Sequence, residues 1–303
     1  MKISVVIPTR NRPQELLECI RSIMVQSVLP DELIIVDTSD TENAYTKIRS
    51  ALPKEKLKYI HANLSITSAD HQRNIGVRNS SGDIIFFLDD DMVLDKDFIK
   101  EIVKVFEGDS EKKIGGVMGN IVNVQRHSNI KTNLLLLFQR IFLLTGFGDG
   151  RFRSSGCPTF VHGIAEIKNV EFLSGGLTAY RREVFKDFRF DEDFRNAMFT
   201  DDEDFSYRVS RKYQNVYTPY AKIVHNPSRI GRIDRRIKAK MTVEARYYLL
   251  KKNFPRTLKH PVAFWWSVIG YLLQAIMTGD RESIKGTIDG IHNIKEIAST
   301  YVQ

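Results

Sequence analysis

The sequence predicts an α/β fold in which a mostly parallel sheet carries helices on both faces. Two observations predict it. Short runs rich in Val and Ile alternate with amphipathic helical patterns through residues 2–88. These apolar runs also end in polar or acidic residues, which is typical of the carboxyl edge of a parallel sheet. Strand–helix–strand units of this spacing join by right-handed crossovers, so both faces of the sheet are covered.

The first part of the chain divides into four predicted strands and three predicted helices. The first helix begins at Pro13, a residue favoured at a helix start, and places Leu16, Ile20 and Ile23 on one face. The fourth strand is fully apolar and runs directly into three aspartates. The predicted strands are 2–8, 33–36, 57–60 and 83–88, and the predicted helices are 13–24, 41–52 and 68–79.

The second half is less regular. The segment 131–147 is strongly apolar, and 134–147 is interpreted mainly as core. Residues 146–163, rich in Gly, Ser and Pro, are interpreted as a loop. Helical spacing of apolar residues continues from Ile230 through Met241. We therefore expect an α/β domain over 1–228 and a helical extension over 229–303. The remaining predicted elements are a strand at 170–180 broken at Gly175 and Gly176, a helix at 201–213 and a strand at 216–224.

Composition and charge narrow the class of protein. A hydrophobic fraction of 42% and a charged fraction of 27% argue against a disordered chain, a fibre or a multi-pass membrane protein. Two cysteines and no visible secretory signal favour a reducing, cytoplasmic location. Residues 229–259 hold 11 Lys and Arg against Asp234 and Glu244, a net +9 within a chain of net +8. Such a segment is either a solvated helix face or a surface that attracts phosphate groups.

Three consecutive aspartates, Asp89, Asp90 and Asp91, follow the fourth strand. Carboxylates so close together repel unless they are solvated or neutralised. Mg²⁺ or Mn²⁺ with oxygen ligands is the natural neutraliser, and a turn that caps a helix over 96–106 is the alternative. Their position directly after a buried strand favours the metal.

A second acidic run, residues 201–204, opens a predicted helix. Acidic residues are common in a first helical turn because they offset the helix dipole, and one of them is alternatively a general base near the metal. His225 ends a predicted strand. Its side chain has either a structural role or contacts a metal or a phosphate, and both alternatives stay open. Arg73 pairs either with a diphosphate or with a neighbouring strand end.

Taken together, these segments resemble the family 2 inverting glycosyltransferases of GT-A fold. The order and spacing of the matching segments agree with that family over about residues 1–225, and six motifs in order are far more specific than one. The motifs are SVVIPTRNRP, ELIIVDTSDT, QRNIGVRNSSGDIIFFLDDDM, FLSGGLTAYRREVF, TDDEDFSYRV and YTPYAKIVH.

The resemblance implies a role for each matching position. Asp89 and Asp91 correspond to the Asp-x-Asp pair that holds a divalent cation on the donor diphosphate, and His225 to a His that approaches the metal. Asp202 corresponds to the catalytic base, the second acidic residue of the family's Glu-Asp motif, with Asp201 in the Glu position. The sugar nucleotide is expected to contact Pro8, Thr9, Arg10, Asp37, Arg73, Asp90, Gly175 and Gly176.

The implied reaction is metal-dependent transfer of one sugar from a nucleoside-diphosphate sugar, with inversion. Two departures from the family pattern matter. Thr38 stands where the family often has a second Asp, so the base of the nucleotide stays open. The Gln-x-x-Arg-Trp motif of processive synthases is not visible, which favours single transfer over polymerisation.

The acceptor implied is a hydroxyl of a glycan or a lipid-linked molecule, and no nucleic-acid partner is expected. The apolar run Val262–Met277 is short for a transmembrane helix. It is interpreted as an interfacial helix on the cytoplasmic face of an anionic membrane, or as a packed helix that joins a homodimer. Residues 134–147 are, as an alternative to core, a surface near a lipid-linked acceptor.

Two other functions compete with this one. A sugar nucleotidyltransferase also uses a Rossmann-like sheet and metal-binding aspartates, but the loop from Pro8 to Pro13 lacks the glycines expected there. A non-enzymatic basic protein that binds nucleic acid or an anionic membrane explains the basic segment, but leaves both acidic clusters unexplained.

Overall fold

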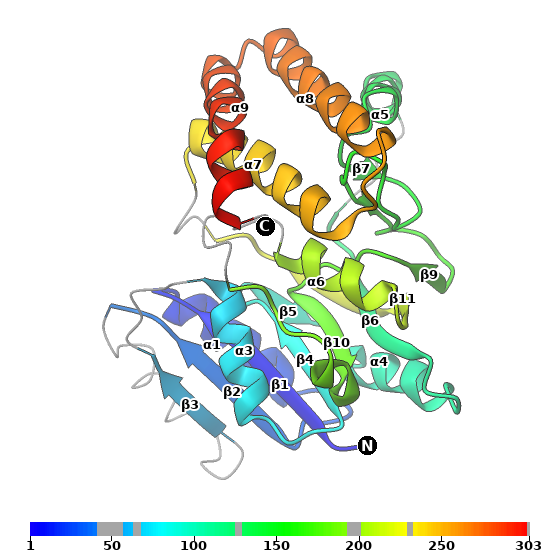
Figure 1. Ribbon diagram of the computed structural model, residues 1–303. Helices are drawn as coiled ribbons and strands as arrows, with labels where there is room; N and C mark the ends of the chain where they lie inside the picture. Colours follow the sequence, from blue (N-terminus) through cyan, green and yellow to red (C-terminus); the bar gives the residue numbers. More distant parts are fainter. Residues whose placement is uncertain (41–56, 63–67, 125–128, 193–200, 229–232, 302–303) are drawn as a thin grey trace.

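The computed structural model describes residues 1–40, 57–62, 68–124, 129–192, 201–228 and 233–301. Its centre is a nine-stranded mixed sheet in the order β3-β2-β1-β4-β10-β6-β11-β5, with β9 paired to β11 (Figure 1). The strands are β1 Ile3–Thr9, β2 Glu32–Asp37, β3 Leu57–His61, β4 Ile84–Leu88, β5 Met92–Leu94, β6 Ile114–Ile121, β9 Lys168–Val170, β10 Leu177–Arg181 and β11 Gln214–His225.

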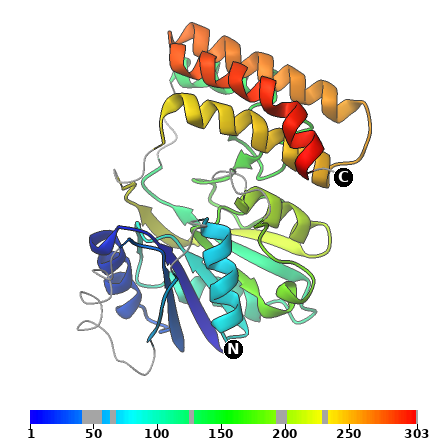
Figure 2. The same cartoon turned by 60° about the vertical axis from the view of Figure 1, so that its left-hand side comes forward.

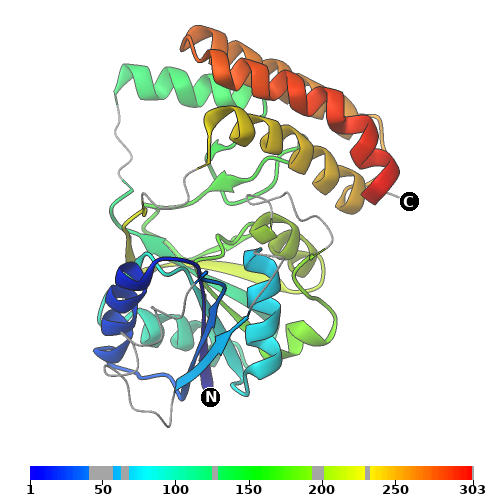
Figure 3. The same cartoon turned by 90° about the vertical axis from the view of Figure 1, so that its left-hand side faces the viewer.

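The mostly parallel sheet predicted for the first part of the chain is confirmed. Strand β1 pairs in parallel with both β2 and β4, and β2 pairs in parallel with β3. Helices α1 (Pro13–Met24) and α4 (Phe98–Glu107) cover one face, and α3 (Ala69–Asn79) covers the other (Figures 1 and 3). The predicted helix 41–52 lies outside the described residues.

The predicted strand 170–180 is wrong as a single element. Its ends form two strands in different places: β9 pairs with β11, whereas β10 runs antiparallel between β4 and β6. The glycines Gly175 and Gly176 stand in the turn that leads into β10. After β10 the chain makes a short 3-10 helix, η1 (Arg182–Lys186).

The C-terminal extension is helical, as predicted. Helices α7 (Arg235–Asn253), α8 (Lys259–Met277) and α9 (Arg281–Tyr301) form a layer beyond the sheet (Figure 2). They enclose a small core of their own, made of Val243, Leu250, Phe264, Val268 and Ile294. Among the described helices, none combines the length and apolar character needed to cross a membrane.

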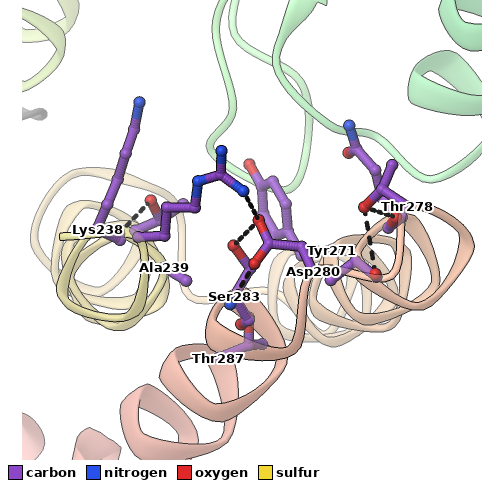
Figure 4. Close-up of a pocket in the computed structure, with 11 residues that line it drawn as sticks. Lys238, Ala239, Tyr271, Thr278, Asp280, Ser283 and Thr287 are labelled. Atoms are coloured by element: carbon purple, nitrogen blue, oxygen red, sulfur yellow. Dashed lines mark hydrogen bonds and ion pairs between the residues drawn. The ribbon is translucent and has the colours of Figure 1, made fainter.

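The three C-terminal helices meet around a polar hollow of ≈ 380 Å³ (Figure 4). Asp280 stands at the start of α9 and accepts hydrogen bonds from the Ser283 backbone N–H at 3.1 Å and from the Ser283 hydroxyl at 3.0 Å. The Arg235 guanidinium lies 3.5 Å from the same carboxylate. Asp280 therefore caps the start of α9 and contacts α7 through Arg235.

The interpretation of 134–147 as core is wrong for its helical part and holds only near its end, where Leu144 is 1% exposed. Helix α5 (Ile130–Ile141) contains no buried residue, and Ile130 is 79% exposed. At its C-terminal end, Phe142 stacks on Trp266 of α8. The segment that follows, predicted as a loop, is mostly irregular and forms one small two-stranded sheet of β7 (Gly146–Phe147) and β8 (Thr159–Phe160).

Candidate active site

The predicted site residues gather at the carboxyl edge of the sheet. Thr9 ends β1, Asp37 ends β2, the aspartates 89–91 follow β4, and His225 ends β11. The parallel pairing of β1 with β2 and β4 brings these ends together, as the alternation of strands and helices predicts. Pro8 lies one residue inside this edge, paired with Val36.

Asp90 joins the β1 loop to the end of β4. Its carboxylate is 3% exposed and accepts hydrogen bonds from the Thr9 hydroxyl at 2.7 Å and from Arg12 Nη1 at 3.1 Å. Burial raises the pKa of Asp90 to about 7, against the opposing effect of its bonds to Thr9 and Arg12. Sequence reasoning missed Arg12, whose partner lies 78 residues away.

Asp91, which directly precedes β5, contacts His225 at the end of β11. His225 Nε2 lies 3.4 Å from Asp91 Oδ1, and Asp91 Oδ2 accepts a 3.3 Å hydrogen bond from the Ser228 backbone. The bond to Asp91 raises the pKa of His225. Burial raises the pKa of Asp91, but the bonds and charges of its neighbours, His225 first, outweigh burial and leave that pKa low. A carboxylate and an imidazole at this spacing are a donor pair that suits Mn²⁺ or Mg²⁺.

Asp89 faces a different partner. Arg73, on α3, has a side chain only 4% exposed, and its guanidinium lies 3.3 Å from Asp89 Oδ1 and 2.9 Å from Asp202 Oδ1. One arginine thus bridges the two acidic clusters. Across the described residues, no three His, Cys, Asp or Glu side chains are already arranged around one metal position.

Gly175 and Gly176 each lie very close to a carboxylate of the site. The Gly175 backbone N–H donates to Asp202 Oδ2 at 2.7 Å. A Cβ atom on Gly175 would lie 1.8 Å from Asp202 Oδ1, and one on Gly176 would lie 2.1 Å from Asp89 Oδ2. Any side chain at either position would displace one of these carboxylates.

The nucleotide end of the predicted pocket contains Asp37, which is fully buried. Its carboxylate accepts from the Ser39 backbone at 2.7 Å and from the Tyr59 hydroxyl. Gln72, missed by sequence reasoning, donates to the backbone carbonyls of Thr9 at 2.9 Å and Val36 at 2.7 Å. Arg10 lies apart from this cluster, in an exposed 3.5 Å pair with Asp40.

The second acidic run opens helix α6 (Asp201–Ser210), and its members have different partners. Asp202 faces Arg73 and Gly175. Glu203 instead accepts two hydrogen bonds from the buried Arg246 of α7, one of which measures 2.7 Å. Asp204 holds Arg208 at 2.6 Å and accepts from Asn253 of α7 at 2.7 Å. The run therefore combines one carboxylate at the site with two that fasten the C-terminal helices to it.

This arrangement defines an α/β protein whose candidate site lies at the carboxyl edge of a mostly parallel sheet, with two acidic clusters bridged by one arginine. The family model described as "Glycosyl transferase family 2" matches residues 4–189. The chain therefore belongs to glycosyl transferase family 2, a family of enzymes. This membership disfavours the nucleotidyltransferase and the non-enzymatic binder.

Several curated glycosyltransferases are similar to part of the chain. An uncharacterised glycosyltransferase of Rickettsia conorii is 33% identical over 106 residues, which is 35% of this chain and 17% of that protein. The O-antigen chain rhamnosyltransferase RfbN of Salmonella typhimurium is 28% identical over 196 residues, 62% of this chain and 54% of that protein. The chain thus matches less than two thirds of the length of these relatives.

Solved structures confirm the GT-A fold. Residues 1–349 of TarS from S. aureus superpose with a TM-score of 0.59 at 14% identity, covering 98% of this chain and 81% of that one. The mannosyltransferase PcManGT from Pyrobaculum calidifontis, in complex with GDP-Man and Mn²⁺, gives a TM-score of 0.60 at 16% identity and covers 97% and 87%. Both alignments include the C-terminal helices.

Proposed function

We propose that this protein transfers one sugar from a nucleoside-diphosphate sugar to a hydroxyl of a glycan or lipid-linked acceptor, with inversion at the anomeric carbon. The observation that carries the proposal is the bridge made by Arg73. Its guanidinium contacts Asp89 on the donor side and Asp202 on the opposite side. A proton acceptor is thereby held beside the place where the donor diphosphate is expected to lie.

Asp202 is the proposed general base. Arg73 and the Gly175 N–H fix its carboxylate, yet its side chain remains 23% exposed, so an acceptor hydroxyl can reach it. As the acceptor oxygen bonds to the anomeric carbon, its proton passes to Asp202 and the bond to the diphosphate oxygen breaks. Because attack and departure take place on opposite faces in one displacement, the configuration inverts.

Asp91 and His225, with Asp89, are the proposed ligands of a divalent cation. Such a cation, when bound, offsets the negative charge that grows on the departing nucleoside diphosphate. The fit rests on the carboxylate and imidazole that β5 and β11 bring within 3.4 Å of each other. The Mn²⁺ named with the Pyrobaculum mannosyltransferase supports the same choice of ion.

Two relatives support the proposed acceptor class. One is named an O-antigen chain rhamnosyltransferase, and another, from Haloferax volcanii, a glucosyl-dolichyl phosphate glucuronosyltransferase. We propose a cytoplasmic site of action, because both cysteines are buried and unpaired, as expected under reducing conditions.

The test of this proposal is a transfer assay with a panel of sugar nucleotides, with the anomeric configuration of the product read by NMR. Asp202→Asn keeps the shape of the side chain and removes the base. We expect it to lose at least about a hundredfold in kcat while binding donor as wild type does. The control is Asp187→Asn, a surface carboxylate paired with Lys212. Wild-type turnover in Asp202→Asn, or a product with retained configuration, would overturn the mechanism.

A further inference from the structure

Helices α5 and α8 both expose many apolar side chains, named here together the α5–α8 surface. On α8 the exposed apolar side chains recur every three or four residues along the whole helix, so they form one stripe. The opposite side of α8 packs through Phe264 and Val268 onto α7 and α9. The exposed members are Ile130, Leu134, Leu135, Leu137 and Ile141 of α5 and Val262, Trp265, Trp266, Ile269, Leu273, Ile276 and Met277 of α8.

The two helices are fixed to each other. Trp266 Nε1 donates a 2.8 Å hydrogen bond to the Ile141 carbonyl, and the Trp266 ring stacks on Phe142 with centroids 4.9 Å apart. Both helices lie on the part of the molecule away from the N-terminal strands (Figures 1 and 3). Exposed apolar patches of this kind mark interaction sites in proteins that are otherwise monomeric and soluble.

The two segments that form this surface carry a net positive charge. Residues 129–148 and 251–279 contain no Asp or Glu. They contain six basic residues, namely Lys131, Arg140, Lys251, Lys252, Arg256 and Lys259. Lys252 is paired with Asp191 and Asp204, so the positive charge that this surface offers comes from the other five. A surface that unites an apolar stripe, two tryptophans and an excess of positive charge is complementary to the interface of an anionic bilayer.

A cavity of ≈ 620 Å³ opens where α7 passes into α8. Its wall is aromatic and aliphatic, with Phe254, Phe264 and Trp265 among its lining residues, and Lys251, Arg256 and His260 also line it. Leu258, beside it, is 85% exposed. Apolar walls combined with cationic groups suit a lipid phosphate together with its first acyl carbons.

We propose that the α5–α8 surface docks on the interface of an anionic lipid bilayer, with the apolar stripe inserted and the basic residues at the headgroups. The buried opposite face keeps α8 attached to α7 and α9, so the helix lies in the plane of the interface. The inference stands independently of the transfer reaction, and membrane contact would bring the enzyme to lipid-linked acceptors.

The experiment is cosedimentation of the full chain with two kinds of vesicle, one of phosphatidylcholine alone and one that also contains about 30% phosphatidylglycerol. The second kind carries enough anionic lipid to attract basic segments. We expect binding to the anionic vesicles that high salt weakens without abolishing, since burial of apolar groups is not screened. The chain has two tryptophans, both in the stripe, so its intrinsic fluorescence should shift to the blue and be quenched by brominated lipid.

Two variant sets separate the apolar from the electrostatic contribution. Four substitutions on the α5–α8 surface should weaken vesicle binding by at least about tenfold. Four substitutions of similarly exposed apolar residues elsewhere should leave vesicle binding unchanged. The stripe variant is Leu134→Gln with Leu137→Gln, Ile269→Gln and Ile276→Gln, and its control is Val25→Gln with Leu29→Gln, Val122→Gln and Ile167→Gln. Arg256→Gln with Lys259→Gln should reduce the preference for anionic vesicles, whereas Lys112→Gln with Lys186→Gln should leave it unchanged.

The outcomes are decisive in both directions. Loss of binding in the stripe variant, with an unchanged circular dichroism melt and unchanged donor hydrolysis, supports the proposal and leaves the catalytic site untouched. Wild-type protein that ignores anionic vesicles at low salt overturns it, as does a stripe variant that binds like wild type. A wild-type dimer that the stripe variant converts to a monomer, without vesicle binding, shows that the surface joins two copies and also overturns it.

Discussion

The buried ion pair between Arg246 and Glu203 offers the sharpest test of how the C-terminal helices support catalysis. Arg246, on α7, is 6% exposed and Glu203, on α6, is 5% exposed. Arg246 also donates to the Gly156 carbonyl at 2.9 Å. Burial lowers the pKa of the Arg246 guanidinium, but the charge of Glu203 outweighs it and raises that pKa. Arg246 therefore stays charged, and its charge is balanced by the Glu203 carboxylate.

Arg246→Met removes one charge and keeps much of the side-chain volume. It leaves the Glu203 carboxylate buried without its partner, a situation that costs about 3–5 kcal/mol in other proteins. We expect the free energy of unfolding, measured by urea denaturation, to fall by about that amount. Because Glu203 adjoins Asp202 on α6, kcat should fall as well, with donor KM changed little.

The same helix supplies the matched control. Arg236 pairs with Asp289 at 2.6 Å, but their side chains are 48% and 33% exposed. Arg236→Met should therefore cost much less stability than Arg246→Met, because water and salt screen an exposed pair. The double variant Arg246→Met with Glu203→Gln should recover stability relative to Arg246→Met, since no unpaired charge remains. If Arg246→Met costs no more than Arg236→Met, the buried pair does not fasten α7 to α6 and the reasoning is refuted.

Three further perturbations test other parts of the structure. Glu32 accepts hydrogen bonds from Lys58 and from Ser4 and Ser81, which outweigh burial and lower its pKa to about 2. The stability that the Glu32 carboxylate contributes is complete above pH 4.5 and is lost as pH falls toward 2. The melting temperatures of wild type and Glu32→Gln should therefore differ at pH 7 and converge in acid. A difference that stays constant with pH would contradict this. Gly175→Ala places a methyl group against Asp202 and should reduce kcat by about a hundredfold with the melt retained, whereas Gly108→Ala, with only ordinary contacts, should not. Chelator should abolish transfer, added Mn²⁺ or Mg²⁺ should restore it, and Asp91→Ala should weaken metal-dependent donor binding in calorimetry; full activity in chelator excludes a metal role.

The sequence by itself determined the α/β class, the parallel first half of the sheet and the helical extension. Hydrophobic periodicity reports which face of a segment is buried, and that information is local. It also determined that Thr9, Asp37 and the aspartates 89–91 share one edge, because parallel strands end on the same side. The family resemblance rested on motifs of the same local kind.

The tertiary structure alone decided which partner each polar residue has. Three successive aspartates face Arg73, Arg12 and His225 in turn, and the neighbours Asp202 and Glu203 pair with two different arginines. It also decided that α5 is exposed and that β10 inserts antiparallel between β4 and β6. An apolar or acidic pattern indicates that a residue needs a partner of some kind. Which residue that partner is depends on contacts between segments that lie tens to more than a hundred residues apart in the sequence. Those contacts are selected by packing of the whole chain, so no local pattern contains them.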